Sequence, residues 1–503
     1  MDRMSPSEVQ ALNVLQAAID EAGAQRNLIP PEPWVAALAS SPSKFADWVE
    51  LRLMVGAPNA QAAVVNTRKS GQGVRPVPIV GVGERIAYRA LTNYVVQDLS
   101  FPTRSLEEYH QFLNGPILQG LGGSGDIRSL APATSKYIAE TDIAAFYQYV
   151  DHSVLRAELE FQAARVYETG LLVDLLGEIQ GTAFGLPQLL DPSDLLSEVY
   201  IRILERDLVR QGLSLWRYND DFKFLASRYD GAQIAVEQVS DAARRLGLVL
   251  SDQKTHISKL LTYIIRNAST TVDEDDAQID VNAALSTVSG DYADTIMSAE
   301  EANGVLSRIG SREPSRERLD LRNLRHEDVK LLRSALNALI HHEDDGGLRY
   351  SIALMLFAPA LTPKVCMYLI GMFDAHADEV DSLWDILTSS HTDALSDWQR
   401  AWLVYIARSC GLLVLRPESR RSWIRAQLLR NGDLLHAEAS LCLAQEGAIE
   451  FGDLDMSLRV RPEALSPWYV LGIKELASIG LVGPQQLAAV KQSSVLYRLL
   501  LES

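Results

Sequence analysis

The chain has 503 residues, a length that predicts about two to four domains, since single domains usually hold about 100–200 residues. Hydrophobic residues make up 47% and charged residues 22%, a composition that excludes an intrinsically disordered chain. No run of about eighteen apolar residues occurs, and the first ten residues lack the basic and apolar regions of an export signal. We therefore expect a globular cytoplasmic protein with no membrane span.

The net charge of −18 limits how the chain can contact nucleic acid. Proteins that bind long stretches of nucleic acid usually carry a surplus of Lys and Arg, because neutralising phosphates supplies much of the affinity. The acidic balance therefore disfavours a long duplex footprint. Any contact with nucleic acid is expected to be local, or to be made in an oligomer in which small basic patches add up.

The first quarter of the chain changes from helical to extended patterns. Residues 1–60 have the apolar spacing of amphipathic helices. Short apolar runs with Gly and Pro then predict a hairpin over Val64–Val80, with a flexible tip at Ser70–Gly73. A helix is expected over roughly Glu84–Asp98. The Gly-rich stretch Gly115–Gly125 predicts a loop, and it lacks the strand-to-helix context of a phosphate-binding fingerprint.

Strands then alternate with helices up to about residue 265. The segment YIAETDI predicts a strand ending near Asp142, and a long helix follows the residues GLPQ. A compact strand–turn–strand follows in LWRYNDDFKFLA, with its turn at Asn219–Asp220. Interleaved strands and helices are typical of α/β or α+β domains, so residues 61–265 are predicted to form one such domain.

The remaining residues are expected to be a linker followed by helices. Residues 266–324 include an acidic stretch around Asp273–Asp276 and predict a linker or covering segment. From residue 325 to 503 nearly every segment has helical periodicity, although no clean repeat is visible. Many helices separated by short breaks favour an α-solenoid of HEAT-like pairs or an irregular bundle.

Three aspartates are the strongest candidates for chemistry. Phosphodiester synthesis with two divalent ions needs carboxylates that hold the ions about 3.5–4 Å apart. The tetrapeptide Tyr218–Asp221 places two adjacent acids in a turn between apolar strands, and Asp142 ends another apolar strand. Acids between buried strand ends cost stability unless a cation compensates them. The alternative for these residues is a plain acidic turn.

The order of the motifs resembles that of reverse transcriptases over roughly residues 60–260. TDIAAFYQYVDH is similar to the first palm motif, in which an aromatic residue follows the Asp by five positions. GLPQ is similar to the LPQ motif, RYNDDF to the YxDD motif, and LGLVLSDQKT to the later palm motif with its Lys. The resemblance implies an α+β fold, with right-hand fingers and palm followed by the all-α HEAT-like domain.

Within that family the chain most resembles the abortive-infection and "unknown group" branch, the defence-associated reverse transcriptases. In that branch a Ser and then a Leu-(Ala/Ser)-Glu sequence follow the LP motif. Here these positions are Ser193 and Leu196–Ser197–Glu198. The pair Phe146–Tyr147 in the first motif and the added helical half are also similar to that branch.

The resemblance implies a metal site and a nucleotide site. The ions would be Mg²⁺, with Mn²⁺ as the alternative, held by the following groups: the carboxylates of Asp142, Asp220 and Asp221 and the main-chain carbonyl of Ile143. Tyr147 stands where the family places the aromatic that blocks a ribose 2′-hydroxyl, and Gln188 belongs to the LPQ motif beside the incoming base. Lys254 would protonate the leaving pyrophosphate. The alternatives are a core aromatic for Tyr147 and a solvated lysine for Lys254.

Basic residues of the predicted hairpin and the helix after it complete the site. Lys69 and Arg75 stand where residues of the fingers clamp the triphosphate, and both side chains suit phosphate oxygens. Arg68, Arg85 and Arg89 are expected to contact nucleic acid as one locally basic patch.

The sequence departs from the family at Leu189, because a Gly normally follows the LPQ motif. Glycine lets the backbone approach the nascent base pair closely, whereas a leucine side chain occupies that space. Together with the acidic charge, this departure favours restricted or template-independent synthesis.

The resemblance implies an antiphage DNA polymerase that uses dNTPs, works as a trimer or hexamer and makes single-stranded DNA primed from a protein hydroxyl. Later tyrosines are the candidate primers: Tyr350, Tyr368, Tyr405, Tyr469 and Tyr497. One alternative is an RNA-templated enzyme that copies a dedicated noncoding RNA. The other is a non-catalytic scaffold with a vestigial palm.

Overall fold

The computed structural model describes residues 3–24, 26–69, 73–101, 105–121, 136–268, 297–309, 319–321, 324, 326–389, 392–414 and 417–503. These residues belong to two compact units: Met1–Ala90 with Ile296–Ser503, and Leu91–Thr295. We call them the first and the second unit. Residues 70–72 of the predicted hairpin tip and the acidic stretch Asp273–Asp276 lie outside the described residues.

The second unit is built on a four-stranded antiparallel sheet with the order β4-β5-β3-β6. Its strands are β3 (Tyr137–Asp142), β4 (Leu215–Tyr218), β5 (Asp221–Ala226) and β6 (His256–Lys259). The central pair, β3 and β5, is aligned so that Asp142 lies directly opposite Asp221. The predicted strand–turn–strand is the hairpin β4–β5, in which Tyr218 also pairs with Asp221.

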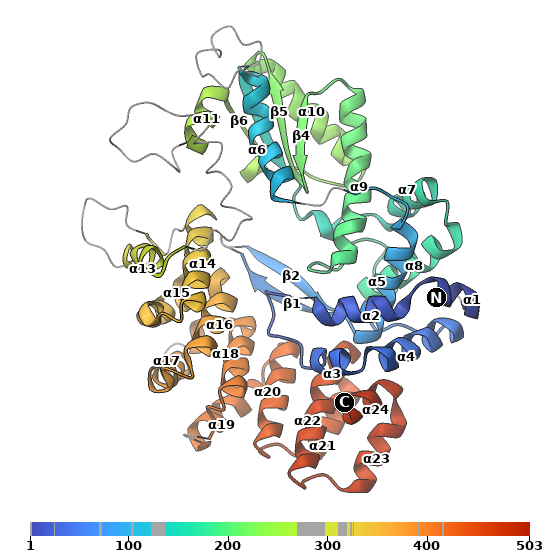
Figure 1. The fold of residues 1–503 in the computed structure, drawn as a ribbon, viewed down its shortest axis with the longest axis vertical. Helices are drawn as coiled ribbons and strands as arrows, with labels where there is room; N and C mark the ends of the chain where they lie inside the picture. Colours follow the sequence, from blue (N-terminus) through green and yellow to red (C-terminus); the bar gives the residue numbers. More distant parts are fainter. Residues whose placement is uncertain are drawn as a thin grey trace. The chain divides into compact units, whose positions relative to one another are not determined.

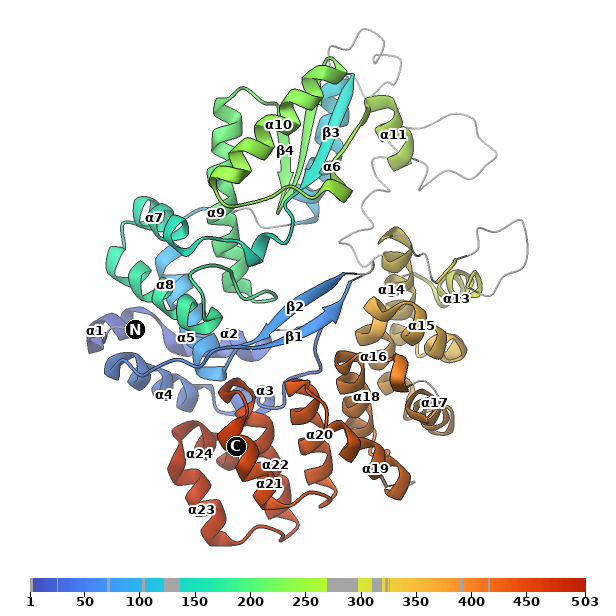
Figure 2. The same cartoon turned by 180° about the vertical axis from the view of Figure 1, so that it is seen from behind.

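Helices cover both faces of this sheet (Figures 1 and 2). Helix α10 (Tyr229–Arg245) packs on β3 and β5 through small residues, Ala232, Ala235 and Ala242 among them. Helix α6 (Leu106–Gly120) packs on β4 and β5. The other helices of the unit are α7 (His152–Ala163), α8 (Val166–Gln180), α9 (Asp191–Arg210) and α11 (Leu260–Ala268), with the short 3₁₀ turns η2 (Phe146–Gln148) and η3 (Asp252–Lys254).

Helix α6 corrects the expectation of a loop from Gly115, because the helix continues to Gly120. A Cβ atom on Gly115 would lie 2.1 Å from Nε1 of Trp216, and one on Gly120 would lie 2.1 Å from Cδ2 of Leu260. The glycines therefore let the helix backbone approach the neighbouring side chains closely. They serve packing here rather than chain reversal.

The N-terminal part of the first unit contains four helices and a hairpin. The helices are α1 (Pro6–Ala11), α2 (Val14–Gly23), α3 (Val35–Ser40) and α4 (Pro42–Val55), and the hairpin strands are β1 (Ala63–Arg68) and β2 (Val74–Ile79). The two strands pair antiparallel, from Ala63 opposite Ile79 to Arg68 opposite Val74, as the sequence predicts. Helix α5 (Val82–Val96) follows, close to its predicted bounds, and leads into the second unit.

In the rest of the first unit, the regular elements of the described residues are all helices or 3₁₀ turns. Its helices are α13 (Ala299–Ser307), α14 (His326–His341), α15 (Ser351–Phe357), α16 (Thr362–Met372), α17 (Ala377–Ser389), α18 (Asp397–Ser409), α19 (Pro417–Gln427), α20 (Asp433–Gln445), α21 (Phe451–Val460), α22 (Ser466–Ser478), α23 (Pro484–Ser493) and α24 (Val495–Glu502), with the 3₁₀ turns η5 (Asp345–Tyr350), η6 (Pro359–Leu361), η7 (Thr392–Ala394) and η8 (Glu463–Leu465). Helices α14, α16, α18, α20, α22 and α24 pack in succession. Helices α15, α19, α21 and α23 each pack against the next helix of this row. This alternation is the two-layered packing of a helical solenoid, and it confirms the predicted all-α C-terminal domain.

The N-terminal residues pack along the solenoid, which is why they belong to the same unit as the C-terminal helices. Strand β1 contacts α18 and α20, and α4 contacts α24. The main-chain oxygen of Leu28 accepts hydrogen bonds from the indole nitrogens of Trp398 (2.6 Å) and Trp402 (3.3 Å). The sequence predicted four consecutive segments, divided at residues 60, 265 and 324. In the structure the hairpin and the N-terminal helices instead share one unit with the C-terminal helices. Among the described residues, no helix has the length and apolarity needed to cross a membrane.

Candidate active site

Three carboxylates converge at one end of the palm sheet. Asp142 is the last residue of β3 and Asp221 the first of β5, so their pairing brings them side by side, and Asp220 precedes Asp221 in the turn. One oxygen atom from each of the three side chains lies within 4.8 Å of the others. No other group of three or more potential metal ligands converges in this way within the described ranges.

The turn that carries Asp220 is held in a restrained conformation. Asn219 has a φ of +53°, in the left-handed region, which asparagine adopts more readily than most residues. The main-chain oxygen of Asn219 accepts a hydrogen bond from Nη1 of Arg217 (3.1 Å), and that of Asp220 accepts one from the amide of Ile143 (3.1 Å). The two contacts fix the turn relative to β4, which contains Arg217, and to the end of β3, which precedes Ile143.

Arg217 is itself fixed by α9, a connection that the sequence analysis did not identify. Its guanidinium donates to both carboxylate oxygens of Glu198 (2.5 and 3.1 Å) and to Glu205 (2.9 Å). Such a bidentate pair defines both distance and orientation. Glu198 is the acid of the Leu-Ser-Glu sequence after the LP motif, so that sequence supports the turn that carries Asp220 through Arg217.

The electrostatics of the trio favour a bound cation. Asp142 is only 6% exposed, and its Oδ1 is buried without a hydrogen-bond donor among the described residues. Burial, and then the charges of Asp142 and Asp220, raises the pKa of Asp221 to about 7. The two neighbouring acids therefore oppose the ionisation of Asp221. Because carboxylate oxygens are the preferred ligands of hard divalent cations, the three residues fit such an ion.

Lys254 directly contacts the trio, as its predicted role requires. Its Nζ lies 2.9 Å from Oδ2 of Asp142, although the side chain is 61% exposed. Partial burial opposes its charge, but the hydrogen bond and the attraction to Asp142 outweigh that effect and raise the pKa of Lys254. The structure thus pairs the lysine with Asp142, and its role as proton donor stays a prediction.

Main-chain contacts fix the segment around Ile143, the predicted carbonyl ligand. Ile143 forms an isolated bridge with Leu250, and the amide of Ser251 donates to the main-chain oxygen of Asp142 (2.8 Å). Because the amide of Ile143 also donates to the main-chain oxygen of Asp220, the backbone at this end of β3 is held from both sides. Metal ligation by the carbonyl of Ile143 stays a prediction.

Tyr147 lies in η2, directly after the strand that ends at Asp142, and its ring is half-buried. Its hydroxyl group donates a 2.5 Å hydrogen bond to Oδ1 of Asp194 in the first turns of α9. The role of Tyr147 in excluding a ribose 2′-hydroxyl stays a prediction. Gln188, from the LPQ motif, is half-buried in the turn before α9, and its contact with a nucleotide stays a prediction.

Leu189 occupies a conformation that suits the glycine expected there. Its φ is +65°, in the left-handed region that costs an L-residue with a side chain about 1–2 kcal/mol. The LPQ turn therefore has a glycine-type backbone without a glycine. Ala145, in the first motif, also has a positive φ of +51°. Backbone strain of this kind tends to concentrate at functional sites.

Replacing Leu189 by glycine should stabilise the protein by about 1 kcal/mol, because the strain disappears while glycine's extra freedom in the unfolded chain offsets part of the gain. Urea denaturation of the two proteins measures the difference. Ala144→Gly, at a position of the first motif without positive φ, is the control and should destabilise. A destabilised Leu189→Gly variant would show that packing of the leucine outweighs the strain.

The predicted basic patch is corrected in two of its three residues. Arg85 is 1% exposed and forms ion pairs with Glu21 and Glu32, and its guanidinium lies 4.8 Å from the ring of Trp34. Arg89 is also buried and donates to Glu21 over 2.8 Å. Both cations are neutralised inside the first unit. The sequence signal was misleading because their acidic partners lie more than fifty residues away in the chain.

The other three predicted basic residues lie on the hairpin of the first unit. Lys69 and Arg68 are exposed and Arg75 is half-buried. A further cation, Arg333 of α14, lies near Arg75: burial, and then repulsion by Arg75, lowers the pKa of Arg333. Sequence reasoning did not identify Arg333, because it lies far along the chain in a helical segment. Phosphate binding by Lys69 and Arg75, and nucleic-acid binding by Arg68, stay predictions.

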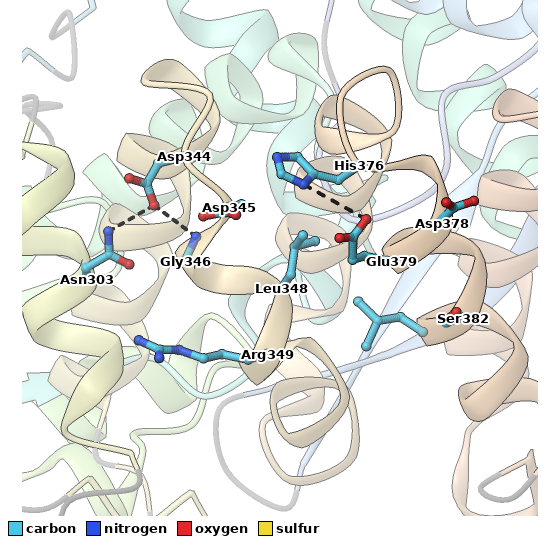
Figure 3. Close-up of a pocket in the computed structure, with 11 residues that line it drawn as sticks. Asn303, Asp344, Asp345, Gly346, Leu348, Arg349, His376, Asp378, Glu379 and Ser382 are labelled. Atoms are coloured by element: carbon cyan, nitrogen blue, oxygen red, sulfur yellow. Dashed lines mark hydrogen bonds and ion pairs between the residues drawn. The ribbon is translucent and has the colours of Figure 1, made fainter.

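The solenoid also contains an open acidic cavity of about 890 Å³ (Figure 3). Its acids interact with their neighbours: Asp344 accepts hydrogen bonds from Asn303 and the amide of Gly346, both over 2.9 Å, and Glu379 lies 4.0 Å from His376. Because its carboxylates do not converge as those of the palm do, the cavity is not the candidate metal site.

Comparison with solved structures finds telomerases at low similarity. They are telomerase from Candida albicans in complex with a TWJ fragment of telomeric RNA (10% identity, TM-score 0.29), apo telomerase from Candida tropicalis (10%, 0.30) and the Candida tropicalis enzyme with the TWJ fragment (10%, 0.31). The matches cover 74%, 69% and 82% of this chain. The chain spans 64%, 68% and 64% of the telomerase chains. No curated protein matches the chain.

Comparison with family models gives a match over residues 67–278, to the family described as reverse transcriptase (RNA-dependent DNA polymerase). The matched segment contains the three converging carboxylates, Lys254 and Tyr147. Its strands form the antiparallel sheet on which the carboxylates meet. Residues 67–278 are therefore similar to the reverse-transcriptase family, and the sheet of the second unit lies within this matched segment.

Proposed function

We propose that the protein is a DNA polymerase of the reverse-transcriptase type that adds deoxynucleotides to a growing strand by two-metal nucleotidyl transfer. The observation that carries this proposal is the convergence of Asp142, Asp220 and Asp221 within 4.8 Å. Mg²⁺ ions held there would activate the attacking 3′-hydroxyl and stabilise the leaving pyrophosphate. The oxygen of that hydroxyl bonds to the α-phosphorus of the dNTP, and the bond from phosphorus to pyrophosphate breaks.

The protein's own groups support this reaction in distinct ways. Lys254 is protonated and lies beside Asp142, so it can give its proton to the departing pyrophosphate. Tyr147 has a half-buried ring and follows Asp142 closely in the sequence. Its ring would exclude a ribose 2′-hydroxyl. Lys69 and Arg75 would hold the triphosphate, as the family resemblance implies.

We further propose that synthesis does not depend on a conventional template and serves defence against phage. Three features support restricted template use: the net charge of −18, the neutralised Arg85 and Arg89, and Leu189 in a glycine-type turn. The defence role rests on the resemblance to the defence-associated branch. The competing proposal is RNA-templated synthesis on a dedicated noncoding RNA.

Protein priming is part of the same proposal, and burial narrows its candidates. Tyr368 and Tyr469 are 0% exposed, so their hydroxyls cannot reach a catalytic site without local unfolding. The half-buried tyrosines Tyr350, Tyr405 and Tyr497 are the better candidates. Mass spectrometry of the purified protein tests priming, because a covalent nucleotide adds its mass to one tyrosine peptide. A wholly unmodified protein after dNTP incorporation would exclude it.

The test of template use is synthesis by nuclease-treated protein, with Mg²⁺ and all four dNTPs, followed by sequencing of the product. Template-independent synthesis predicts a homopolymer or a product of random sequence. A defined sequence, lost after nuclease treatment, would establish the copying of an RNA instead. Protection of bacteria against phage should disappear in the Asp220→Ala/Asp221→Ala variant, and protection that persists would support the scaffold alternative.

Mg²⁺ binding should strengthen as pH rises through about 7. Burial and the neighbouring acids raise the pKa of Asp221 to about 7, so below that pH the ion must displace a proton. We expect affinity to fall by up to about tenfold per pH unit below pH 7 and to level off above it. Calorimetric titration in two buffers of different ionisation enthalpy measures both the affinity and the released proton. Affinity independent of pH between 6 and 8 would contradict the assignment of Asp221.

A further inference from the structure

The first turns of α9 carry polar side chains to the ring of Tyr147. Asp194 accepts the hydrogen bond of the Tyr147 hydroxyl at 2.5 Å. Ser197, one turn later, lies with its Oγ 3.3 Å from the same hydroxyl and donates to the main-chain oxygen of Asp194 over 2.8 Å. Ser197 is buried. The three side chains therefore form one hydrogen-bonded group within the second unit.

Tyr147 is held at its main chain and at its hydroxyl group. Its main-chain oxygen accepts a hydrogen bond from the amide of Leu186 (2.7 Å), which belongs to the LPQ segment. The neighbouring ring of Phe146 is buried and meets the Tyr147 ring edge-on, with 5.7 Å between the centroids. With its backbone fixed by Leu186 and its hydroxyl fixed by Asp194, the ring has little freedom to turn about its side-chain torsions.

Asp194 is well placed to hold the hydroxyl because its own position is defined by the start of α9. The helix begins after Leu190 with Pro192 in its first turn, where proline's fixed φ suits a helix. The amide of Asp194 donates to the main-chain oxygen of Leu190 (3.3 Å). A hydrogen bond to an ionised acceptor is stronger than one between neutral groups, so this contact restrains the ring more than a neutral acceptor would.

We propose that Asp194 is a positioning residue for sugar selection: by holding the hydroxyl of Tyr147, it fixes the ring as a rigid barrier to a ribose 2′-hydroxyl. This inference rests on the proposed function, since it concerns the nucleotide site of the polymerase. A barrier excludes one additional oxygen atom only if it cannot move aside, and catalytic and binding groups need positions held within about 0.5 Å. Asp194 need not touch the nucleotide to have this effect.

The test is a double-mutant cycle on the full-length protein, with the ratio of kcat/KM for dATP over ATP as the measured quantity. Tyr147→Phe removes only the hydroxyl, and Asp194→Ala removes its acceptor. Each should lower the ratio by about tenfold, chiefly through a lower KM for ATP, as expected when a hydrogen bond between two groups is lost. The double variant should lower it no further, because both changes remove one contact. Asp194→Asn keeps an acceptor oxygen and should restore most of the selectivity.

A matched control and a second readout separate this inference from the proposed function. Asp207→Ala removes another acid of α9, one that pairs with Arg245 on the exposed side, and should leave the ratio unchanged. Binding of dATP and ATP with Ca²⁺ in place of Mg²⁺ measures discrimination without turnover. Selective binding without incorporation would refute the proposed polymerase activity while supporting the positioning role of Asp194. If Tyr147→Phe retains full discrimination in both assays, or if the two changes add, the inference is wrong.

Discussion

Replacing Asp221 by asparagine is expected to abolish nucleotide incorporation and, at the same time, to stabilise the folded protein. The amide introduced by this change would lack the negative charge that a divalent ion needs. Loss of groups that merely orient metal ligands usually costs about 10–100-fold, so loss of a direct ligand should exceed about a hundredfold. Steady-state incorporation of a labelled dNTP measures this loss.

The gain in stability follows from the same cluster of charges. The folded-state pKa of Asp221, about 7, lies above its ordinary value of 3.8. The folded form thus retains a proton that the unfolded form releases, and the wild-type protein loses stability as pH rises between those values. In EDTA at pH 8, Asp221→Asn should be more stable by about 1–2 kcal/mol in urea denaturation. The gain should shrink as pH falls below 7.

Asp241→Asn is the matched control for this prediction. Asp241 is exposed and pairs with Arg244 over 3.3 Å on the surface of α10. Its replacement should change neither incorporation nor stability by a measurable amount. If Asp221→Asn behaves like this control in both assays, the three acids are a plain acidic turn, as the alternative interpretation of the sequence holds.

Replacing Arg85 by methionine should destabilise the first unit by about 3–5 kcal/mol, because it leaves buried carboxylates without their partner. Arg85 is 1% exposed and pairs with Glu21 and Glu32. Arg89 and Arg26 remain beside those glutamates, at 2.8 and 3.6 Å, so the lower end of the range is expected. Chemical denaturation followed by tryptophan fluorescence suits this test, since Trp34 lies against the guanidinium.

Two variants show whether charge imbalance is the cause. Arg156→Met removes an exposed arginine that pairs with Glu160 on the same helix, and should cost about 0–1 kcal/mol. The double variant Glu32→Gln/Arg85→Met removes one of the carboxylates left unpaired and should recover part of the loss. If Arg85→Met costs no more than Arg156→Met, Arg85 is not the buried structural cation described above.

The convergence of the three aspartates was predictable from the sequence, because the motifs that carry them are short and local. The turn at Asn219–Asp220 lies between two apolar strands, and Asp142 ends a third, so the pairing of β3 with β5 is enough to unite the acids. The fold class was also predictable, since helical periodicity persists to the end of the chain.

Contacts between distant residues were not predictable from local patterns. Arg85 and Arg89 look like a basic patch in sequence, and only the folded chain brings Glu21 and Glu32 to them. The support of Asn219 by Glu198 through Arg217 likewise depends on tertiary packing. The helical conformation at Gly115 was missed because glycine usually indicates a break, whereas here it permits close approach to Trp216.

The most direct test of the central claim is incorporation of the four labelled dNTPs by the purified full-length protein, with Mg²⁺ and with EDTA. The assay is run without nucleic acid and with an RNA-templated primer, so that neither mode of synthesis is overlooked. The three converging acids predict a polymer of deoxynucleotides that forms with Mg²⁺, disappears in EDTA and is absent from the Asp142→Asn variant. Absence of incorporation under both conditions, or equal incorporation by wild type and Asp142→Asn, would contradict the account.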